Sequence, residues 1–335
     1  MGSVWTAHHL VLGTKVAVKF MSGPAAELPN ADARFLREAR ITANIDSPHV
    51  VRVLDCRHDE ADEPYLVLEL LHGETLEERV RRHGPLPVFE LVEIVSQICE
   101  ALAATHDARI LHRDLKPENV FLVAGPHPFV KLIDYGVARP LEVAECLAID
   151  LLPAGTPEYM SPEHMFEPET TDVRADLFSL AAVAYFALTR RTPFYAQSLE
   201  GLHFALDGGA FEPPSKLRPE LPAALDRWFE KALAHSPNDR FTNAREMANA
   251  LHDTAREARE AQFRIVETSA AAEDTEPSSP HPTLAEIVIP VRRMRPSRRT
   301  AILAVLLAVA AGIFAWHSSG PSVPNANAST ETVSP

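Results

Sequence analysis

Cysteine is scarce in this sequence of 335 residues, and its scarcity narrows the chemistry that the chain can carry. The three cysteines, Cys56, Cys99 and Cys146, lie far apart and form no C-x-x-C pair. A disulfide framework needs an even set of cysteines and a structural zinc site needs closely spaced ones, so the pattern fits neither. We therefore expect the protein in a reducing compartment.

Basic residues are few relative to acidic ones. Lysine and arginine together number 32 against 46 aspartates and glutamates, which gives a net charge of −14. A surface this acidic repels the phosphate backbone of DNA and RNA, so nucleic acid is not an expected partner. The first residues, Met1 to Trp5, lack the basic and apolar parts of a secretory signal, and we expect this end of the chain in the cytosol.

The apolar content of 46% and the charged content of 23% are typical of a globular protein. The length allows one two-lobed domain or two ordinary domains. Strand-favouring runs occur at residues 15–20, 50–54 and 65–70, with a helical pattern at 33–43. The first part of the chain is therefore predicted to form a small sheet with one helix.

The spacing of the apolar residues changes from Pro87 onward. They now recur at the spacing of one helix face: Leu91, Ile94, Val95, Ile98 and Leu102. Residues 177–188 are apolar almost all round, which is typical of a helix buried on every side. We expect an α+β fold with a small β-rich lobe over residues 1–71 and a larger helical lobe over residues 72–258.

The composition changes again beyond residue 258. Residues 259–299 are rich in Ser, Pro, Ala and acidic residues and end in several arginines, which predicts a flexible linker with a basic end. Residues 300–316 carry no charge and follow those arginines, as a transmembrane helix with a cytoplasmic basic flank does. A buried or interfacial helix is the alternative. The polar residues 317–335 are expected to form a short disordered tail outside the cytoplasm.

The strongest motif is His-Arg-Asp-Leu-Lys-Pro-Glu-Asn over residues 112–119. It resembles the catalytic loop of protein kinases. The resemblance implies that Asp114 accepts the proton of the substrate hydroxyl and that Asn119 binds a magnesium ion. It also implies that Lys116 contacts the transferred phosphate, as in the branch of the family specific for serine and threonine.

Two further motifs follow the order of the same family. Asp134-Tyr135-Gly136 resembles the metal-binding triplet, with tyrosine where phenylalanine is usual, and implies that Asp134 is a magnesium ligand. A tyrosine fits the same apolar position only if its hydroxyl finds a hydrogen-bond partner. Val16-Ala17-Val18-Lys19 resembles the strand whose lysine pairs with the α- and β-phosphates of ATP, and Glu38 resembles the glutamate that holds this lysine.

The resemblance also implies a nucleotide site. Leu68 takes the gatekeeper position, and Glu69 and Leu71 lie in the hinge that binds adenine through backbone groups. The full set implied to contact the nucleotide is Gly2, Val4, Ala17, Lys19, Leu68, Glu69, Leu71 and Phe121. The apolar members of this set fit an ordinary core equally well.

Residues 155–163 resemble the end of the activation segment of serine/threonine kinases. By the same resemblance Thr156 touches the catalytic loop, Glu163 pairs with Arg240, and Asp176 braces the backbone of the catalytic loop. We expect these last three residues to support the structure rather than to react.

The resemblance departs from the family at the first motif. The family carries G-x-G-x-x-G-x-V, whereas here only Gly2 and Val4 match its last part, so we expect the small lobe to lack its first strand. Either the chain is truncated in its glycine-rich loop, or Met1 is an internal methionine.

Together these motifs identify the chain as a bacterial, eukaryotic-like (Hanks-type) serine/threonine protein kinase with a two-lobed protein-kinase-like fold. This identity implies ATP and Mg²⁺ as cofactors and cytoplasmic proteins as substrates, and the predicted helix adds the lipid bilayer as a partner and the cell membrane as the location. The alternative is a membrane-anchored pseudokinase that binds partners. A small-molecule kinase is disfavoured by Lys116 and by residues 155–163. Self-association into a homodimer stays open.

Overall fold

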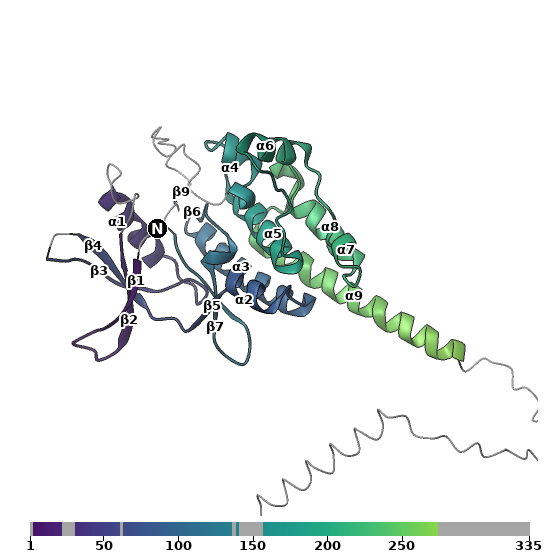
Figure 1. Cartoon of the computed structure of the whole chain (residues 1–335), viewed down its shortest axis with the longest axis horizontal. Helices are drawn as coiled ribbons and strands as arrows, with labels where there is room; N and C mark the ends of the chain where they lie inside the picture. Colours follow the sequence, from purple (N-terminus) through teal and green to yellow (C-terminus); the bar gives the residue numbers. More distant parts are fainter. Residues whose placement is uncertain (1–2, 22–30, 61–62, 136–138, 141–156, 274–335) are drawn as a thin grey trace, which may run out of the picture. The chain divides into compact units, whose positions relative to one another are not determined.

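The computed structural model describes residues 3–21, 31–60, 63–135, 139–140 and 157–273. The described residues form a β-rich lobe followed along the chain by a helical lobe (Figure 1). This arrangement confirms the predicted α+β organisation.

The first lobe contains a four-stranded antiparallel sheet in the order β1-β2-β4-β3. Its strands are β1 (Ser3–His8), β2 (Lys15–Phe20), β3 (Val53–His58) and β4 (Pro64–Glu69). The tight β1–β2 connection includes Gly13, whose φ of 66° favours glycine because it has no Cβ. The predicted strand at residues 15–20 is confirmed.

Helix α1 (Ala31–Ala43) lies against this sheet, as the helical pattern at residues 33–43 predicts. Phe35 and Ala39 lie one helical turn apart and pack with Leu66 of β4. The buried face of α1 is therefore the face that carries Phe35 and Ala39.

The predicted strand at residues 50–54 is only partly correct. β3 begins at Val53, whereas Val50 bridges to Leu132 and the Val51 N–H donates to the Leu132 carbonyl at 2.9 Å. The apolar run at residues 50–54 therefore has two roles. Val50 and Val51 pair with Leu132 of the large lobe, and only the residues from Val53 onward belong to the sheet of the small lobe.

The second lobe is mainly helical and contains two small sheets, β5-β7-β8 and β6-β9. The strands are β5 (Gly73–Thr75), β6 (Ile110–Leu111), β7 (Val120–Val123), β8 (Phe129–Leu132) and β9 (Arg139–Pro140). The longer helices are α2 (Leu76–His83), α3 (Val88–Asp107), α5 (Val173–Thr189), α6 (Leu199–Gly208), α8 (Ala223–Ala232) and α9 (Ala244–Glu273). Short helices are α4 (Pro162–Phe166) and α7 (Pro214–Leu217), with 3-10 turns at Pro117–Asn119, Pro157–Tyr159 and Pro237–Asp239.

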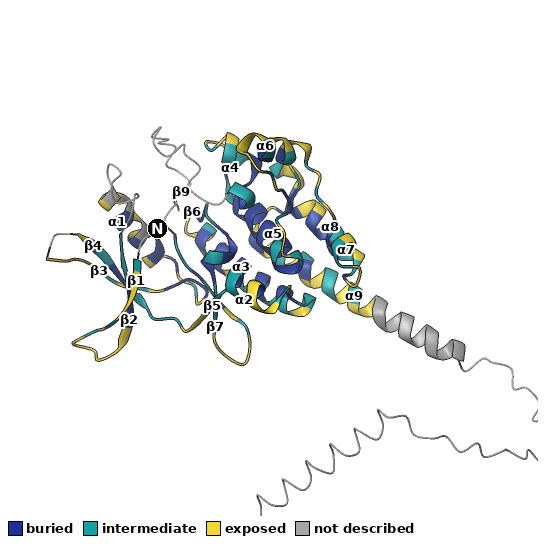
Figure 2. Ribbon diagram, in the orientation of Figure 1, coloured by how far each residue is buried: buried dark blue, intermediate teal, exposed yellow. Residues whose placement is uncertain are grey.

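Helix α5 is the centre of this lobe, as its apolar sequence predicts. Nearly all of its side chains are buried, and α3, α7 and α8 pack against it (Figure 2). The helix begins after Asp172, whose carboxylate caps the first turn by accepting from the Arg174 N–H. It ends at Thr189, and the following residue, Arg190, adopts a left-handed conformation. The core around α5 positions the loops that carry the candidate site.

The end of the chain extends the second lobe. The sequence places the domain boundary at residue 258, whereas α9 continues to Glu273. Among the helices of the described residues, none has both the length and the apolar character of a transmembrane span. The rest of the predicted linker, the predicted span over residues 300–316 and the tail over residues 317–335 lie outside the described residues.

Candidate active site

A cavity of about 210 Å³ is lined by residues of both lobes. Every residue predicted to contact a nucleotide lines this cavity, apart from Gly2, which lies outside the described residues. These lining residues are Val4, Ala17, Lys19, Leu68, Glu69, Leu71 and Phe121. The apolar members therefore face a cavity.

Several lining residues were not predicted from the sequence. Leu66 and Leu70 lie two residues before and after Leu68, so the two-residue period of a strand could have found them. Val53 and Ile133 also line the cavity. They come from segments distant in the sequence, and no local pattern indicates that they meet.

Glu69 lines the cavity, but its carboxylate is held by neighbouring groups. It accepts from the Arg52 N–H at 2.8 Å and from the Lys131 ammonium at 2.5 Å. The Glu69 N–H also donates to the Arg52 carbonyl at 3.1 Å, and the binding of adenine through backbone groups at Glu69 stays a prediction.

The catalytic-loop residues meet beside the cavity. The Lys116 ammonium lies 2.8 Å from an Asp114 carboxylate oxygen, and the Asn119 amide nitrogen donates to the same oxygen at 3.1 Å. The Asn119 amide also donates to the Asp114 carbonyl at 2.7 Å. Because its nitrogen is engaged twice, the amide oxygen of Asn119 is the atom left to bind a cation.

Lys19 reaches Asp134 across the cavity. Its ammonium lies 2.9 Å from a carboxylate oxygen of Asp134. Burial is the largest single influence and disfavours the charged carboxylate. The charge and hydrogen bond of Lys19, together with the charges of His112 and Lys116, outweigh it and hold the pKa of Asp134 below its usual value. Glu38 is placed on α1 as predicted, and its pairing with Lys19 lies outside what the structure describes.

Asp176 braces the catalytic loop, as predicted. Its carboxylate accepts from the backbone N–H groups of His112 and Arg113, each at 2.9 Å, and from the His106 ring at 2.8 Å. These contacts outweigh burial, with the His106 hydrogen bond foremost, and lower the pKa of Asp176 to about 2. Arg113 has a positive φ of 64°, a backbone conformation that residues other than glycine rarely adopt. The hydrogen bonds of Asp176 hold the loop in this conformation.

Tyr135 is buried and its hydroxyl has the partner that the sequence requires. The hydroxyls of Tyr135 and Thr105 lie 3.1 Å apart, and the Tyr135 ring packs on His112 with centroids 4.6 Å apart. The Thr105 hydroxyl donates its hydrogen to the Ala101 carbonyl at 2.8 Å. Tyr135 is therefore the donor to Thr105.

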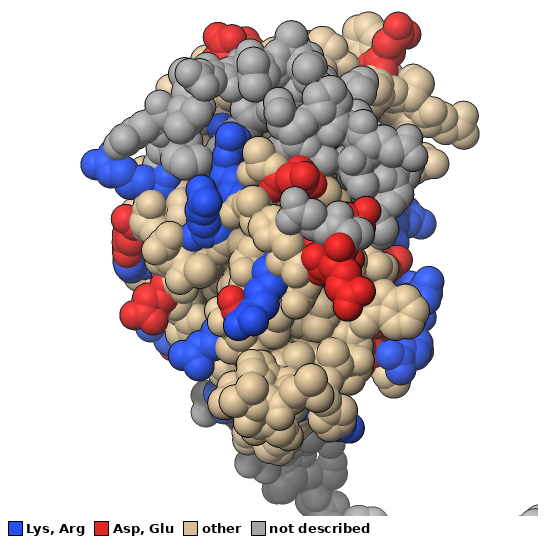
Figure 3. Space-filling view, turned by 90° about the vertical axis from the view of Figure 1, so that its left-hand side faces the viewer, with Lys and Arg blue, Asp and Glu red and all other residues tan. Residues whose placement is uncertain are grey.

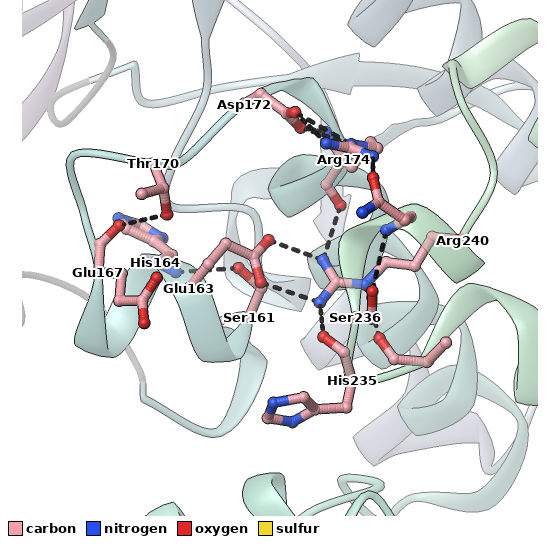
Figure 4. A network of polar contacts seen from close by, with 12 residues as sticks. Ser161, Glu163, His164, Glu167, Thr170, Asp172, Arg174, His235, Ser236 and Arg240 are labelled. Atoms are coloured by element: carbon pink, nitrogen blue, oxygen red, sulfur yellow. Dashed lines mark hydrogen bonds and ion pairs between the residues drawn. The ribbon is translucent and has the colours of Figure 1, made fainter.

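The predicted pair between Glu163 and Arg240 is confirmed (Figure 4). Two guanidinium nitrogens of Arg240 bind the two carboxylate oxygens of Glu163 at 2.7 and 2.9 Å. Both side chains are almost fully buried, and the guanidinium lies over the Phe178 ring at 4.7 Å. Ser161 caps the helix that carries Glu163, and Thr156 lies outside the described residues.

Known proteins share these features. The sequence profile of the protein kinase domain matches residues 1–302. The chain is 36% identical over 284 residues to serine/threonine-protein kinase Pkn1 of Myxococcus xanthus, which covers 82% of this chain and 40% of that protein. It is 34% identical over 250 residues to serine/threonine-protein kinase PknB of Mycobacterium leprae, covering 74% and 40%. The chain therefore spans about 40% of the length of these relatives.

A solved structure supports the fold alone. The crystal structure of the Rad53 kinase domain and SCD2 matches with a TM-score of 0.61 at 23% identity. The match covers 74% of this chain and 87% of that chain. The predicted two-lobed fold is thereby confirmed.

Proposed function

This chain belongs to the protein kinase family, and we propose that it transfers the γ-phosphoryl group of ATP to serine or threonine hydroxyls of proteins. The observation that carries the proposal is the pair of Lys19 and Asp134 on the wall of one cavity. The Ile133 N–H, from the same wall, donates to the carbonyl of Asn119, whose amide holds Asp114. Lys116, beside Asp114, favours serine and threonine over other acceptors by resemblance to that branch of the family.

In this reaction Asp114 accepts a hydrogen bond from the incoming hydroxyl and takes its proton. The Lys116 ammonium and the Asn119 amide hold the carboxylate in place, so little reorganisation is needed when the substrate arrives. Lys19 offers its positive charge to the phosphates of ATP.

The residues present fit a magnesium ion. Asn119 and Asp134 offer an amide oxygen and a charged carboxylate, the hard oxygen ligands that Mg²⁺ prefers. Mg²⁺ is usually bound by one or two protein ligands together with substrate phosphates, so two side chains are enough for such a site. Magnesium would neutralise the phosphate charge.

The test is transfer of radiolabelled phosphate from ATP to a generic basic protein substrate with magnesium. We expect transfer by the chain and a loss of roughly 10²- to 10⁴-fold in Asp114→Asn, because the acceptor hydroxyl loses its proton acceptor. Nucleotide affinity, measured by calorimetry, should be nearly unchanged in the variant. Nucleotide binding without transfer by the unmodified chain would instead support the pseudokinase alternative, and full activity of the variant would remove Asp114 from the mechanism.

We also propose that the chain is anchored in the cell membrane by residues 300–316, with the kinase domain in the cytoplasm. The uncharged stretch and the arginines before it support this proposal. Deletion of residues 300–335 should move the protein from the membrane fraction to the soluble fraction and leave its phosphotransfer unchanged. If the shortened chain still sediments with membranes after an alkaline wash, the anchor lies elsewhere.

A further inference from the structure

A second hollow, of about 510 Å³, lies between helix α1 and the turn that connects α3 to β6. It is separate from the nucleotide cavity, with which it shares no lining residue. Residues of α1 form one wall, and residues 107–110 form the other. The hollow thus bridges the two lobes of the molecule.

The helical period explains why α1 presents this wall. Phe35 and Ala39 face the sheet, whereas Arg37, Arg40 and Ile41 lie at the three- and four-residue spacing of a different face, which Asn44 continues just beyond the helix. Both arginines are exposed. One face of α1 therefore holds the helix to the sheet, and another carries positive charge into the hollow.

The charge in the hollow is not balanced by its own walls. Among the side chains that the structure describes, no carboxylate forms an ion pair with Arg37 or Arg40. Arg109, on the opposite wall, has an interaction of its own. The one acidic lining residue, Asp107, is already bound by Arg245 of α9 at 2.6 Å. On the face of the molecule in Figure 3, lysine and arginine side chains are interspersed with acidic ones.

We propose that this hollow binds a phosphorylated segment of a protein. Arginine presents a fork of N–H donors that matches a phosphate group, and clusters of arginines are a recurring means of recognising phosphorylated segments. In a chain with a net charge of −14, a hollow lined by arginines is a local region of positive charge that attracts an anion. The reaction proposed above generates phosphoserine and phosphothreonine, so the ligand is of the same chemical class as its product.

The position of the hollow gives the ligand a regulatory effect, and this step rests on the proposed function. Glu38 lies on α1 between Arg37 and Arg40 in the sequence and is predicted to hold Lys19. A phosphate bound by both lobes would fix α1 relative to the catalytic loop. Binding should therefore raise phosphotransfer by favouring the arrangement in which Lys19 is held in place.

The binding test uses the full chain and a fluorescein-labelled peptide with one phosphothreonine among alanines and glycines, followed by fluorescence anisotropy. In Arg37→Gln/Arg40→Gln the affinity should fall by at least about tenfold, since two charge-assisted hydrogen bonds are removed. Arg81→Gln/Arg256→Gln is the matched control, because it removes the same charge from exposed positions on α2 and α9. Its affinity should equal that of the unmodified chain.

Three outcomes would overturn the proposal. They are equal affinity in the two double variants, equal affinity for the unphosphorylated peptide, and equal affinity for a peptide with glutamate in place of phosphothreonine. Inorganic phosphate should compete only weakly. If free phosphate binds as tightly as the peptide, the ligand is the free anion and not a protein segment.

The activity arm separates this proposal from the proposed function. Without the peptide, the unmodified chain and Arg37→Gln/Arg40→Gln should transfer phosphate at the same rate. The phosphopeptide should accelerate only the unmodified chain. The anisotropy measurement needs no catalysis. A chain without phosphotransfer would therefore refute the proposed function and leave the binding test intact. Peptide binding without acceleration would refute the regulatory effect.

Discussion

The molecule contains two buried or partly buried ion pairs, Glu163–Arg240 in the helical lobe and Lys19–Asp134 at the cavity. They differ in how many hydrogen-bond partners each charged group has. Arg240 binds both oxygens of Glu163, and its remaining donors reach the carbonyls of Arg174, Ala234 and His235. Lys19 and Asp134 meet at 2.9 Å on the wall of a cavity, with about a third of the Asp134 side chain exposed. The first pair is enclosed by protein, whereas the second faces a space that a ligand can enter.

This difference distinguishes an ion pair that stabilises the fold from one that can bind a ligand. A bidentate pair with every donor used can change only if the surrounding structure changes, so the Glu163–Arg240 pair fixes the position of α4 relative to the end of the 3-10 turn Pro237–Asp239. A lysine and an aspartate on a cavity wall can each take a new partner at modest cost. For Lys19 and Asp134, the new partners are phosphate and magnesium in the proposed reaction.

The largest effect should come from breaking the enclosed pair. Arg240→Met leaves the Glu163 carboxylate buried without its guanidinium, and the free energy of unfolding should fall by about 3–5 kcal/mol. Urea denaturation followed by circular dichroism measures this loss. The control is Glu163→Gln/Arg240→Met, which leaves no charge unpaired and should lose less. Equal losses in the two variants would show that the ion pair is not what the single substitution breaks.

Breaking the cavity pair should act on function instead. Lys19→Met should lower phosphotransfer by roughly 10²-fold or more, because a preorganised charge aimed at the phosphates is lost. The pKa of Asp134 should rise, since the ammonium that lowers it is gone. NMR titration of the carboxylate and the radiolabel assay measure the two effects. A variant that unfolds as readily as Arg240→Met would contradict the distinction between the pairs.

The sequence predicts the catalytic loop well because its parts are close together in the chain. Asp114, Lys116 and Asn119 fall within six residues, and one turn brings them into contact. The resemblance to a family supplied the longer-range pair of Glu163 and Arg240, which no local pattern indicates.

Contacts between distant segments mark the limit of the prediction. Thr105, the partner of the Tyr135 hydroxyl, precedes the catalytic loop in the sequence, whereas Tyr135 follows it. Only the fold shows that α3, which carries Thr105, contacts the residue after Asp134. The same holds for His106, which binds Asp176 from α3. The beginning of β3 was missed because Val51 pairs with Leu132, and strand propensity does not say which partner an apolar residue takes.

A smaller effect is expected at the Tyr135 hydroxyl, which lies between support and function. Tyr135→Phe removes one buried hydrogen bond and leaves Thr105 still donating to Ala101, so unfolding should become easier by about 0.5–1.5 kcal/mol. Tyr185→Phe is the matched control, because the Tyr185 hydroxyl donates to the Glu212 carbonyl at 2.6 Å away from the cavity.

Calorimetry of magnesium and a non-hydrolysable ATP analogue then separates the two tyrosines. Because Tyr135 follows Asp134 directly, we expect Tyr135→Phe alone to weaken the magnesium-dependent part of the binding. If Tyr135→Phe and Tyr185→Phe lose the same stability and bind the ligands equally well, the Tyr135 hydroxyl stabilises the fold and does not contribute to magnesium binding.

The smallest expected effect is a change in how the stability of the protein depends on pH. His164 follows Glu163 on α4, and the pKa of its ring is lowered first by burial and then by the charge of Arg113. A folded-state pKa below the ordinary value of about 6.5 means that the unfolded chain binds the proton more readily. Stability should therefore rise with pH through this range and fall as the pH drops below about 6.5. Buried His112 acts in the same direction.

His164→Gln should reduce this acid sensitivity, because it removes a ring whose pKa is lowered in the folded protein. The measurement is the urea midpoint at several pH values between about 7.5 and 5, where Asp176 is still ionised because its pKa is about 2. His203→Gln is the control, since His203 is exposed and stacks on Phe166. A pH dependence in His164→Gln as steep as that of the control would mean that the His164 ring does not contribute to the acid sensitivity. A flatter one would show that protonation of this buried ring destabilises the folded protein.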